Sequence, residues 1–264
     1  MAATMRVAVL GLGLIGGSIA RALHARPGGE WSVAAWTPQG SGPRLAGEAG
    51  IIELAAASPE LAIDGADIVI LAAPPLETLG LLRDLGGPLR RFLPADAVIT
   101  DVASTKAAIV ALATELDLRF VGGHPMAGRE VAGFEASDAG LFADRPWVVI
   151  PTADKAAMAG VEAIANACGA RVLHLSADDH DRAVAAISHL PMVLSASLVE
   201  AVAGSPDHGR ADWSVASSLA AGGWESMTRL ARGDVEMGTG IALTNAVEVA
   251  ARLRDVRDVI DGWI

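Results

Sequence analysis

One histidine, His124, has a sequence context that suits a proton donor or acceptor. It stands in residues 120–129, FVGGHPMAGR, between two glycines and Pro125. Proline fixes its own φ and pushes the preceding residue toward extended geometry, so we expect His124 on a stiff turn and not in a helix. Gly122, Gly123 and Gly128 are expected to let the backbone pass close to another segment. The unperturbed pKa of histidine, about 6.5, suits acid/base chemistry, but this stretch alone fits a structural loop histidine equally well.

Three further polar side chains are candidates for a binding or catalytic site. Ser104 lies in residues 101–106, DVASTK, between a predicted strand and a predicted helix. Capping that helix is the more frequent use of such a serine, and contact with a ligand hydroxyl is the alternative. His189 interrupts an apolar helical face before Pro191, where a packed core histidine is the commoner reading. Arg229 suits bidentate carboxylate binding if it reaches a cleft, although such a residue ordinarily lies on a helix surface.

The elements that must position these side chains begin with a dinucleotide fingerprint. An apolar run at residues 6–10 precedes GLGLIG, and a helical pattern follows through residue 25. In such a strand–turn–helix, the first glycine permits the turn, the second admits the pyrophosphate and the third allows close helix packing. The helix N-terminus then offers N–H groups to the phosphates. We expect cofactor contacts from Gly11, Gly13, Leu14, Ile15 and Gly16.

The end of the second predicted strand, residues 32–36, bears on the choice of cofactor. A carboxylate there would bind the ribose 2′-hydroxyl of NAD, but the sequence continues with Thr37. The nearest downstream cation is Arg44. The sequence therefore leaves NADP or NAD open, with a slight preference for NADP. The apolar strand at residues 67–73 ends at the same edge of the sheet, so Ala73 and Pro74 are also expected to contact the cofactor.

The order of elements divides the chain into two predicted domains. Strands and helices alternate up to residue 176, which predicts an α/β fold with a Rossmann-type doubly wound parallel sheet over residues 1–176. Residues 177–264 read as a smaller all-α domain, with one long helix at 178–203 and a closing helix at 240–260. With fewer than about 90 residues, that domain is expected to pack against a second copy, giving a homodimer.

Composition excludes several classes of protein. The 264 residues carry a net charge of -11, which argues against nucleic-acid binding. One cysteine, Cys168, allows no intrachain disulfide, and no His/Cys/Asp/Glu spacing suggests a metal site. The uncharged stretch 183–199 is about 17 residues long, short for spanning a bilayer, and is read as a buried helix. We therefore expect a cytoplasmic protein that binds a small-molecule substrate and no membrane.

Several motifs together resemble the prephenate/arogenate dehydrogenase family. They are GLGLIGGS at 11–18, DVASTK at 101–106, GGHPMAG at 122–128, HDRAVAAISHLP at 180–191 and the region from MTRLARG to LTN at 227–245. They occur in the family's order over nearly the whole chain. The resemblance implies NAD(P)-dependent oxidative decarboxylation of prephenate or arogenate, yielding 4-hydroxyphenylpyruvate or tyrosine, by an enzyme that dimerises through its helical domain.

The resemblance also implies roles for individual residues. His124 would take the proton of the substrate's ring hydroxyl while hydride leaves the same carbon, and Ser104 would orient both partners. Arg229 would anchor a substrate carboxylate, and His189 would line the pocket.

The sequence departs from the family pattern at three places. Met192 stands where many relatives have a second histidine, and Trp-Glu-Ser at 224–226 replaces Phe-Arg-Asp. Arg129 occupies a position usually held by a small hydroxyl residue. Because Glu225 could meet an ammonium group, these changes predict a preference for arogenate.

Two other functions compete with this interpretation. A β-hydroxyacid dehydrogenase shares the layout but uses a lysine of its helical domain, whereas Lys106 and Lys155, the only lysines, both precede residue 176. Tyrosine is absent, which excludes a Tyr-dependent reductase. A non-catalytic nucleotide-binding protein would keep the glycine loop without needing the polar residues above.

Overall fold

The computed structural model describes residues 4–129, 131–205 and 208–264, and the chain forms two compact units, Met1–His180 and Asp181–Ile264. Helix α7 (Ala177–Val184) begins in the first unit and runs into the second. The boundary expected after residue 176 falls at the start of this helix.

The first unit is built on a six-stranded sheet in the order β3-β2-β1-β4-β5-β6, with every pair parallel. This is the strand order of the Rossmann fold, so that prediction is confirmed. The order reverses between β1 and β4, and ligands of such sheets bind at that point. The strands are β1 (Met5–Leu10), β2 (Trp31–Trp36), β3 (Leu54–Ala55), β4 (Ile68–Leu71), β5 (Val98–Asp101) and β6 (Phe120–Val121).

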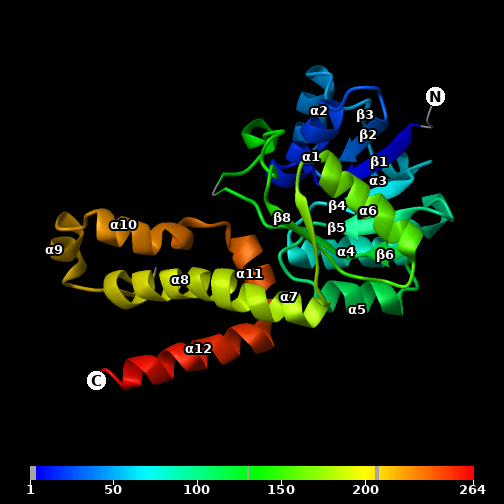
Figure 1. The fold of residues 1–264 in the computed structure, drawn as a ribbon. Helices are drawn as coiled ribbons and strands as arrows, with labels where there is room; N and C mark the ends of the chain where they lie inside the picture. The colour runs from blue at the N-terminus through cyan, green and yellow to red at the C-terminus, as the bar shows by residue number, and fades with distance from the viewer. Residues whose placement is uncertain (1–3, 130, 206–207) are drawn as a thin grey trace. The chain divides into compact units, whose positions relative to one another are not determined.

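Helices cover both faces of this sheet (Figure 1). Alternate residues of β1 point to opposite sides, so Val7 and Val9 join one core while Ala8 and Leu10 join the other. The first core includes α1 (Leu14–His24), α2 (Ser41–Glu48) and α6 (Lys155–Ala167). The second core includes α3 (Pro59–Ile63), α4 (Pro75–Gly86) and α5 (Ala107–Glu115). Residues 41–66, for which the sequence patterns predict no element, form α2, β3 and α3.

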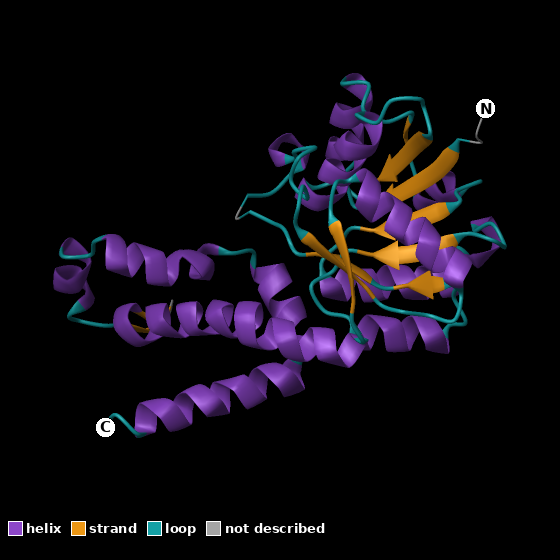
Figure 2. Cartoon of the chain, viewed as in Figure 1, coloured by secondary structure: helices purple, strands orange, loops and turns teal. Residues whose placement is uncertain are grey.

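A second, three-stranded sheet carries His124 (Figure 2). Strand β7 (Gly123–Pro125) pairs antiparallel with β8 (Pro146–Val149), which pairs parallel with β9 (Arg171–His174). His124 thus lies in a strand, so the expectation of a turn there is wrong. Its backbone is extended, as expected before Pro125. A Cβ on Gly122 would lie 2.9 Å from Ile150 Cγ1, which explains why the chain crosses between the sheets at a glycine.

The second unit is helical, and α8 (Leu190–Ala203) packs along α10 (Gly222–Thr228) and α12 (Ala246–Asp261), as Figure 1 shows. The expected single closing helix at 240–260 is wrong, because the chain forms α11 (Val235–Thr244) and α12 with a break at Asn245. The remaining elements are a short hairpin of β10 (Gly204–Ser205) and β11 (His208–Gly209), helix α9 (Trp213–Ser218) and the 3₁₀ turn η4 (Arg229–Arg232).

The long helix contains a π-turn, η3 (Ala185–His189), between α7 and α8. Pro191 cannot donate a backbone hydrogen bond, and a wider turn before it absorbs the mismatch, so the helix continues. Residues Ala177–Ala203 form one helix that is long and apolar enough to cross a membrane, yet only 22% of its most apolar window is buried within the chain. The expectation of a buried helix is therefore wrong for the single chain, because most of this window is not buried.

Candidate active site

The glycine loop has the geometry that a dinucleotide phosphate requires. Gly11 has φ of 106°, and a Cβ there would overlap the Ala72 carbonyl, so the turn needs glycine. A Cβ on Gly16 would overlap the Gly11 carbonyl, which explains the close packing of α1. At Gly13, by contrast, an added Cβ would meet none of the described heavy atoms within 4 Å. The open side of the loop therefore lies at Gly13, where the N-terminus of α1 points.

Two of the expected cofactor contacts lie across the switch point from this loop. Ala73 and Pro74 follow β4 after one intervening residue, Ala72, and β4 pairs with β1 in the sheet. Leu14 and Ile15 form the first residues of α1 and are partly buried. The residues present therefore fit a bound dinucleotide at the carboxyl end of the sheet.

The turn after β2 lies beside the glycine loop. A Cβ on Gly42 would overlap the Leu12 carbonyl, so the first turn of α2 packs directly against that loop. The Thr37 hydroxyl accepts a hydrogen bond from the Gly40 N–H at 3.0 Å, which shapes the turn. Arg44 lies in α2 and pairs with Glu48 at 2.6 Å on an exposed surface.

A buried ion pair holds the loop that carries Ser104. Asp101 and Lys106 are both 0% exposed and form a salt bridge. Asp101 also accepts hydrogen bonds from the N–H groups of Ala103 at 3.0 Å and Gly123 at 3.1 Å. Burial raises the pKa of the Asp101 carboxyl above its usual range, while the Lys106 ammonium and these N–H groups oppose the rise. One carboxylate thus connects the Ser104 loop to the residue before His124.

Ser104 itself is half-buried at the carboxyl end of β5. The N-cap of α5 is Lys106 and not Ser104.

His124 is partly buried and faces a second histidine, His180. Its Nδ1 lies 2.8 Å from Nε2 of His180, and the two rings meet edge to face. His180 belongs to the first turns of α7 and is 1% exposed. Only one of the two nitrogens can carry the shared proton, so the pair fixes the orientation of the His124 ring.

Gly123, the residue before His124, lies in a crowded position. A Cβ there would come within 2.8 Å of the Asp101 carbonyl and 3.2 Å of Trp147 Nε1. The Trp147 indole is 1% exposed and lies opposite Pro125 in the β7–β8 ladder. A side chain at position 123 would displace His124.

Arg129 forms an ion pair with Asp138 at 2.9 Å, with both side chains about half exposed. The Gly140 N–H and the Arg129 guanidinium hold the pKa of Asp138 below its usual range. The predicted role of Arg129 in substrate binding thus concerns a residue that already has a carboxylate partner. Gly128 was expected to make a close approach, but an added Cβ there would meet none of the described atoms within 4 Å.

In the helical unit, His189 is 1% exposed and ends the π-turn. Its Nδ1 lies 3.2 Å from Nδ2 of Asn245, which also donates to the Asp181 carbonyl at 2.9 Å. Met192 is half-buried, and its sulfur would lie 3.8 Å from a Cβ on Gly238. Arg229 and Glu225 are exposed on η4 and α10.

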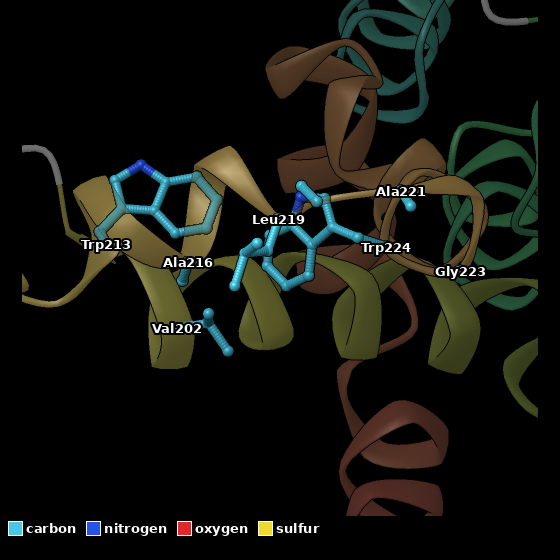
Figure 3. A pocket seen from close by; sticks show the side chains of 8 residues that line it. Val202, Trp213, Ala216, Leu219, Ala221, Gly223 and Trp224 are labelled. Carbon is cyan, nitrogen blue, oxygen red and sulfur yellow. The ribbon is translucent and has the colours of Figure 1, made fainter.

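An apolar hollow of about 370 Å³ in the helical unit contains none of these polar groups (Figure 3). The rings of Trp213 and Trp224 approach to 5.4 Å beside it. Its other lining residues come from α8 to α10 and are Val202, Ala216, Leu219, Ala220, Ala221 and Gly223.

Within the described part of the chain, no group of His, Cys, Asp or Glu side chains is arranged to hold a metal ion. Cys168 is buried, and burial raises the pKa of its thiol to about 12. Neither observation adds a reactive centre to the histidines.

Sequence reasoning did not select three residues of these networks: Asp101, His180 and Asn245. Each stood at the edge of a quoted motif, DVASTK, HDRAVAAISHLP or LTN. The signal that could have found Asp101 and Asn245 is their polar character among apolar neighbours, whereas His180 stands among charged residues and has no such signal. Their partners lie up to 64 residues away, so no local spacing announces them.

Comparison with known proteins gives one consistent result. The family model described as "Prephenate dehydrogenase, nucleotide-binding domain" matches residues 19–174, and "Prephenate dehydrogenase, dimerization domain" matches 176–262. A prephenate dehydrogenase of Lactococcus lactis subsp. cremoris is 32% identical over 97% of this chain and 69% of its own length.

Solved structures agree with the sequence comparison. An arogenate dehydrogenase of Synechocystis is 34% identical with a TM-score of 0.79, covering 98% of this chain and 90% of that one. A prephenate dehydrogenase from A. aeolicus, in complex with hydroxyphenyl propionate and NAD+, is 27% identical with a TM-score of 0.84, covering 98% and 89%.

The family models cover most of the chain, and they describe a nucleotide-binding domain followed by a dimerization domain, in agreement with the predicted fold class. The matches favour this family over the alternative of a β-hydroxyacid dehydrogenase. This chain belongs to the prephenate/arogenate dehydrogenase family of oxidoreductases.

Proposed function

We propose that the protein oxidatively decarboxylates arogenate or prephenate with hydride transfer to NAD(P)+, yielding tyrosine or 4-hydroxyphenylpyruvate. The observation that carries the proposal is the His124–His180 pair, 2.8 Å apart, beyond the carboxyl ends of strands whose other loops fit a dinucleotide. Family membership supplies the substrate class.

His124 is the proton acceptor of this reaction. If Nδ1 keeps its proton and donates it to His180 Nε2, the lone pair of His124 lies on Nε2. That nitrogen takes the proton of the substrate's ring hydroxyl as the carbinol carbon gives up hydride. A positioned base of this kind contributes typically 10²- to 10⁴-fold. When bound, the nicotinamide serves as the hydride acceptor.

The rest of the reaction is driven by the substrate. Breaking the bond to the ring carboxylate releases carbon dioxide and leaves the electron pair in the ring, which becomes an aromatic phenolate. The proton taken by His124 then returns to the ring oxygen, giving the phenol. The protein therefore mainly positions groups. Ser104 orients the ring hydroxyl, Arg229 binds a carboxylate in bidentate fashion, and His189 contributes a further polar contact to the substrate.

We propose arogenate as the preferred substrate. Arogenate carries an ammonium group that Glu225 can meet, whereas the family pattern has a cation at that position. Met192 removes a polar contact made in many relatives. Arg129 adds little positive charge for a second carboxylate, since Asp138 already pairs with it at 2.9 Å.

We propose NADP as the preferred cofactor. Thr37 follows β2 where a carboxylate would repel a 2′-phosphate, and the first turn of α2 packs beside the glycine loop. The N–H groups of that turn and Arg44 suit an anion. The Arg44–Glu48 pair is exposed, so it contributes little to holding Arg44 away.

We propose that the working form is a cytoplasmic homodimer. A dimerization-domain model matches residues 176–262, and the helical unit exposes large apolar side chains such as Ile187, Leu219 and Val247. A second copy would cover this apolar surface and the poorly buried α8 without a membrane.

The test is an absorbance assay for NAD(P)H formation, with arogenate and prephenate crossed against NADP and NAD. We expect the highest kcat/KM for arogenate with NADP. A clear preference for prephenate would overturn the substrate assignment, and no turnover with any pair would favour the non-catalytic alternative.

A further inference from the structure

We infer that Asn245 is a positioning residue that fixes His189 as a neutral imidazole with its proton on Nε2. The helical unit alone carries the inference, through contacts among Asp181, His189 and Asn245. The consequence for catalysis, developed below, rests on the proposed function.

The orientation of the Asn245 amide is set by its first partner. Its side-chain nitrogen Nδ2 lies 2.9 Å from the backbone carbonyl of Asp181. A carbonyl oxygen only accepts hydrogen bonds, so the amide group facing it must be the NH₂ and not the oxygen. This removes the usual ambiguity in placing an asparagine amide.

The second hydrogen of the same NH₂ group then determines the state of His189. Nδ2 of Asn245 lies 3.2 Å from Nδ1 of His189, and the two residues are 5% and 1% exposed. If Nδ1 carried a proton, two N–H groups would face each other in a buried site, which costs the desolvation of both. Nδ1 therefore accepts, and the single proton of the neutral ring is on Nε2.

The backbone places both side chains of this contact at irregular points of their helices. His189 is the last residue of the π-turn, and Asn245 stands at the break between α11 and α12 with φ of -128° and ψ of 31°. At the break between α11 and α12, the Asn245 side chain therefore contacts the long helix. The break in the closing helix thus coincides with the residue that orients His189.

The chemical result is that the two proposed substrate histidines have opposite roles. His124 presents a lone pair at Nε2 and accepts a proton. His189 presents an N–H at Nε2 and donates a hydrogen bond, which suits a carboxylate or carbonyl oxygen of the substrate. With a proton on Nε2, His189 cannot accept the hydroxyl proton there in place of His124.

The inference is tested by long-range ¹H–¹⁵N correlation NMR of the full chain labelled with ¹⁵N-histidine, with His189 assigned from the His189→Gln spectrum. We expect the Nε2–H tautomer of His189 at neutral pH in the unsubstituted protein. A carboxylate at position 245 accepts and cannot donate, so Asn245→Asp should move the proton to Nδ1. Asn166→Asp makes the same chemical change at the only other asparagine, which is exposed, and should leave the His189 signals unchanged.

Kinetics separate this inference from the proposed function. We expect Asn245→Asp to raise KM for the substrate by about ten- to a hundredfold, the range for a lost hydrogen bond to a charged group, with dinucleotide Kd unchanged. An Nδ1–H or imidazolium His189 in the unsubstituted protein overturns the inference, even if Asn245→Asp does not fold. A tautomer change without any change in KM supports the inference and removes His189 from the proposed substrate contacts.

Discussion

The imidazole ring of His124 stands edge-on to that of His180, with 5.0 Å between ring centroids and an interplanar angle of 73°. At this angle the in-plane lone pair of one ring meets the N–H of the other, as their 2.8 Å separation requires. His180 is buried and leaves little freedom for rotation. The ring of His124 is therefore held before any substrate arrives.

Replacing His124 tests its role as proton acceptor. We expect His124→Asn to lower kcat by about 10²- to 10⁴-fold, since asparagine keeps the Nδ1 position but has no basic nitrogen at Nε2. Dinucleotide binding, measured by calorimetry, should be unchanged. A variant that keeps the parental turnover would show that His124 is not the proton acceptor.

His180 should matter through orientation and not through chemistry. We expect His180→Leu to lower kcat roughly ten- to a hundredfold, because a misplaced base loses part of its effect. His180→Gln can place an amide oxygen near the former Nε2 and accept from His124, so it should retain more activity. Equal losses in the two variants, with equal melting temperatures, would argue against the hydrogen bond.

The ion pair of Asp101 and Lys106 should govern stability. We expect Asp101→Asn to lower the free energy of unfolding by about 3–5 kcal/mol, because Lys106 keeps a charge with no carboxylate in a site that is 0% exposed. Urea denaturation measures the change. Adding Lys106→Met should recover part of the loss, and an Asp101→Asn protein within about 1 kcal/mol of the parent would contradict the expected penalty.

The turn after β2 should set the cofactor preference. Thr37→Asp places a carboxylate where NAD-specific enzymes have one, so the ratio of kcat/KM for NADP over NAD should fall by roughly tenfold or more. Thr114→Asp, which adds the same charge on exposed α5, is the control. An unchanged ratio would show that position 37 does not face the ribose.

Cys168 should make stability depend on pH in alkaline solution. The folded thiol has its pKa raised by burial from 9.0 to about 12, so between these values the native state binds more protons than the unfolded state. Stability from this group is therefore complete below about pH 9 and falls as the pH rises toward about 12. Urea denaturation of Cys168→Ala should show a weaker fall over that window, and parallel curves for both proteins would contradict the assigned burial.

The fold was largely predictable because its signals are local. The glycine loop, the continuous apolar strands and their alternation with helices determine the Rossmann order without tertiary information. The separate sheet of β7, β8 and β9 was not predictable, because its pairing depends on contacts between distant segments. The break at Asn245 was not predictable either, because LTNAVE reads as continuous helix and the contacts of Asn245 with Asp181 and His189 join segments far apart in the sequence.

The candidate site was predictable in part for the same reason. His124 and Ser104 stood out because a proline and a strand end mark their positions. The partner of His124 lies 56 residues away, and no spacing rule links them. Glu225 and Arg229 are exposed in this chain, so their surroundings in a dimer cannot be read from one sequence.

The π-turn at Ala185–His189 absorbs one extra residue within the long helix. A wide turn holds one residue more than an α-helical turn, and each residue turns a helix by about 100°. Deleting a residue such as Ala186 would convert the wide turn into an α-helical turn and leave the side chains from Leu190 to Ala203 on nearly the same faces. A one-residue deletion inside the regular part of α8 would instead rotate every side chain that follows it by about 100° around the helix axis. The long helix should therefore tolerate the loss of a residue at the π-turn far better than the same loss within α8.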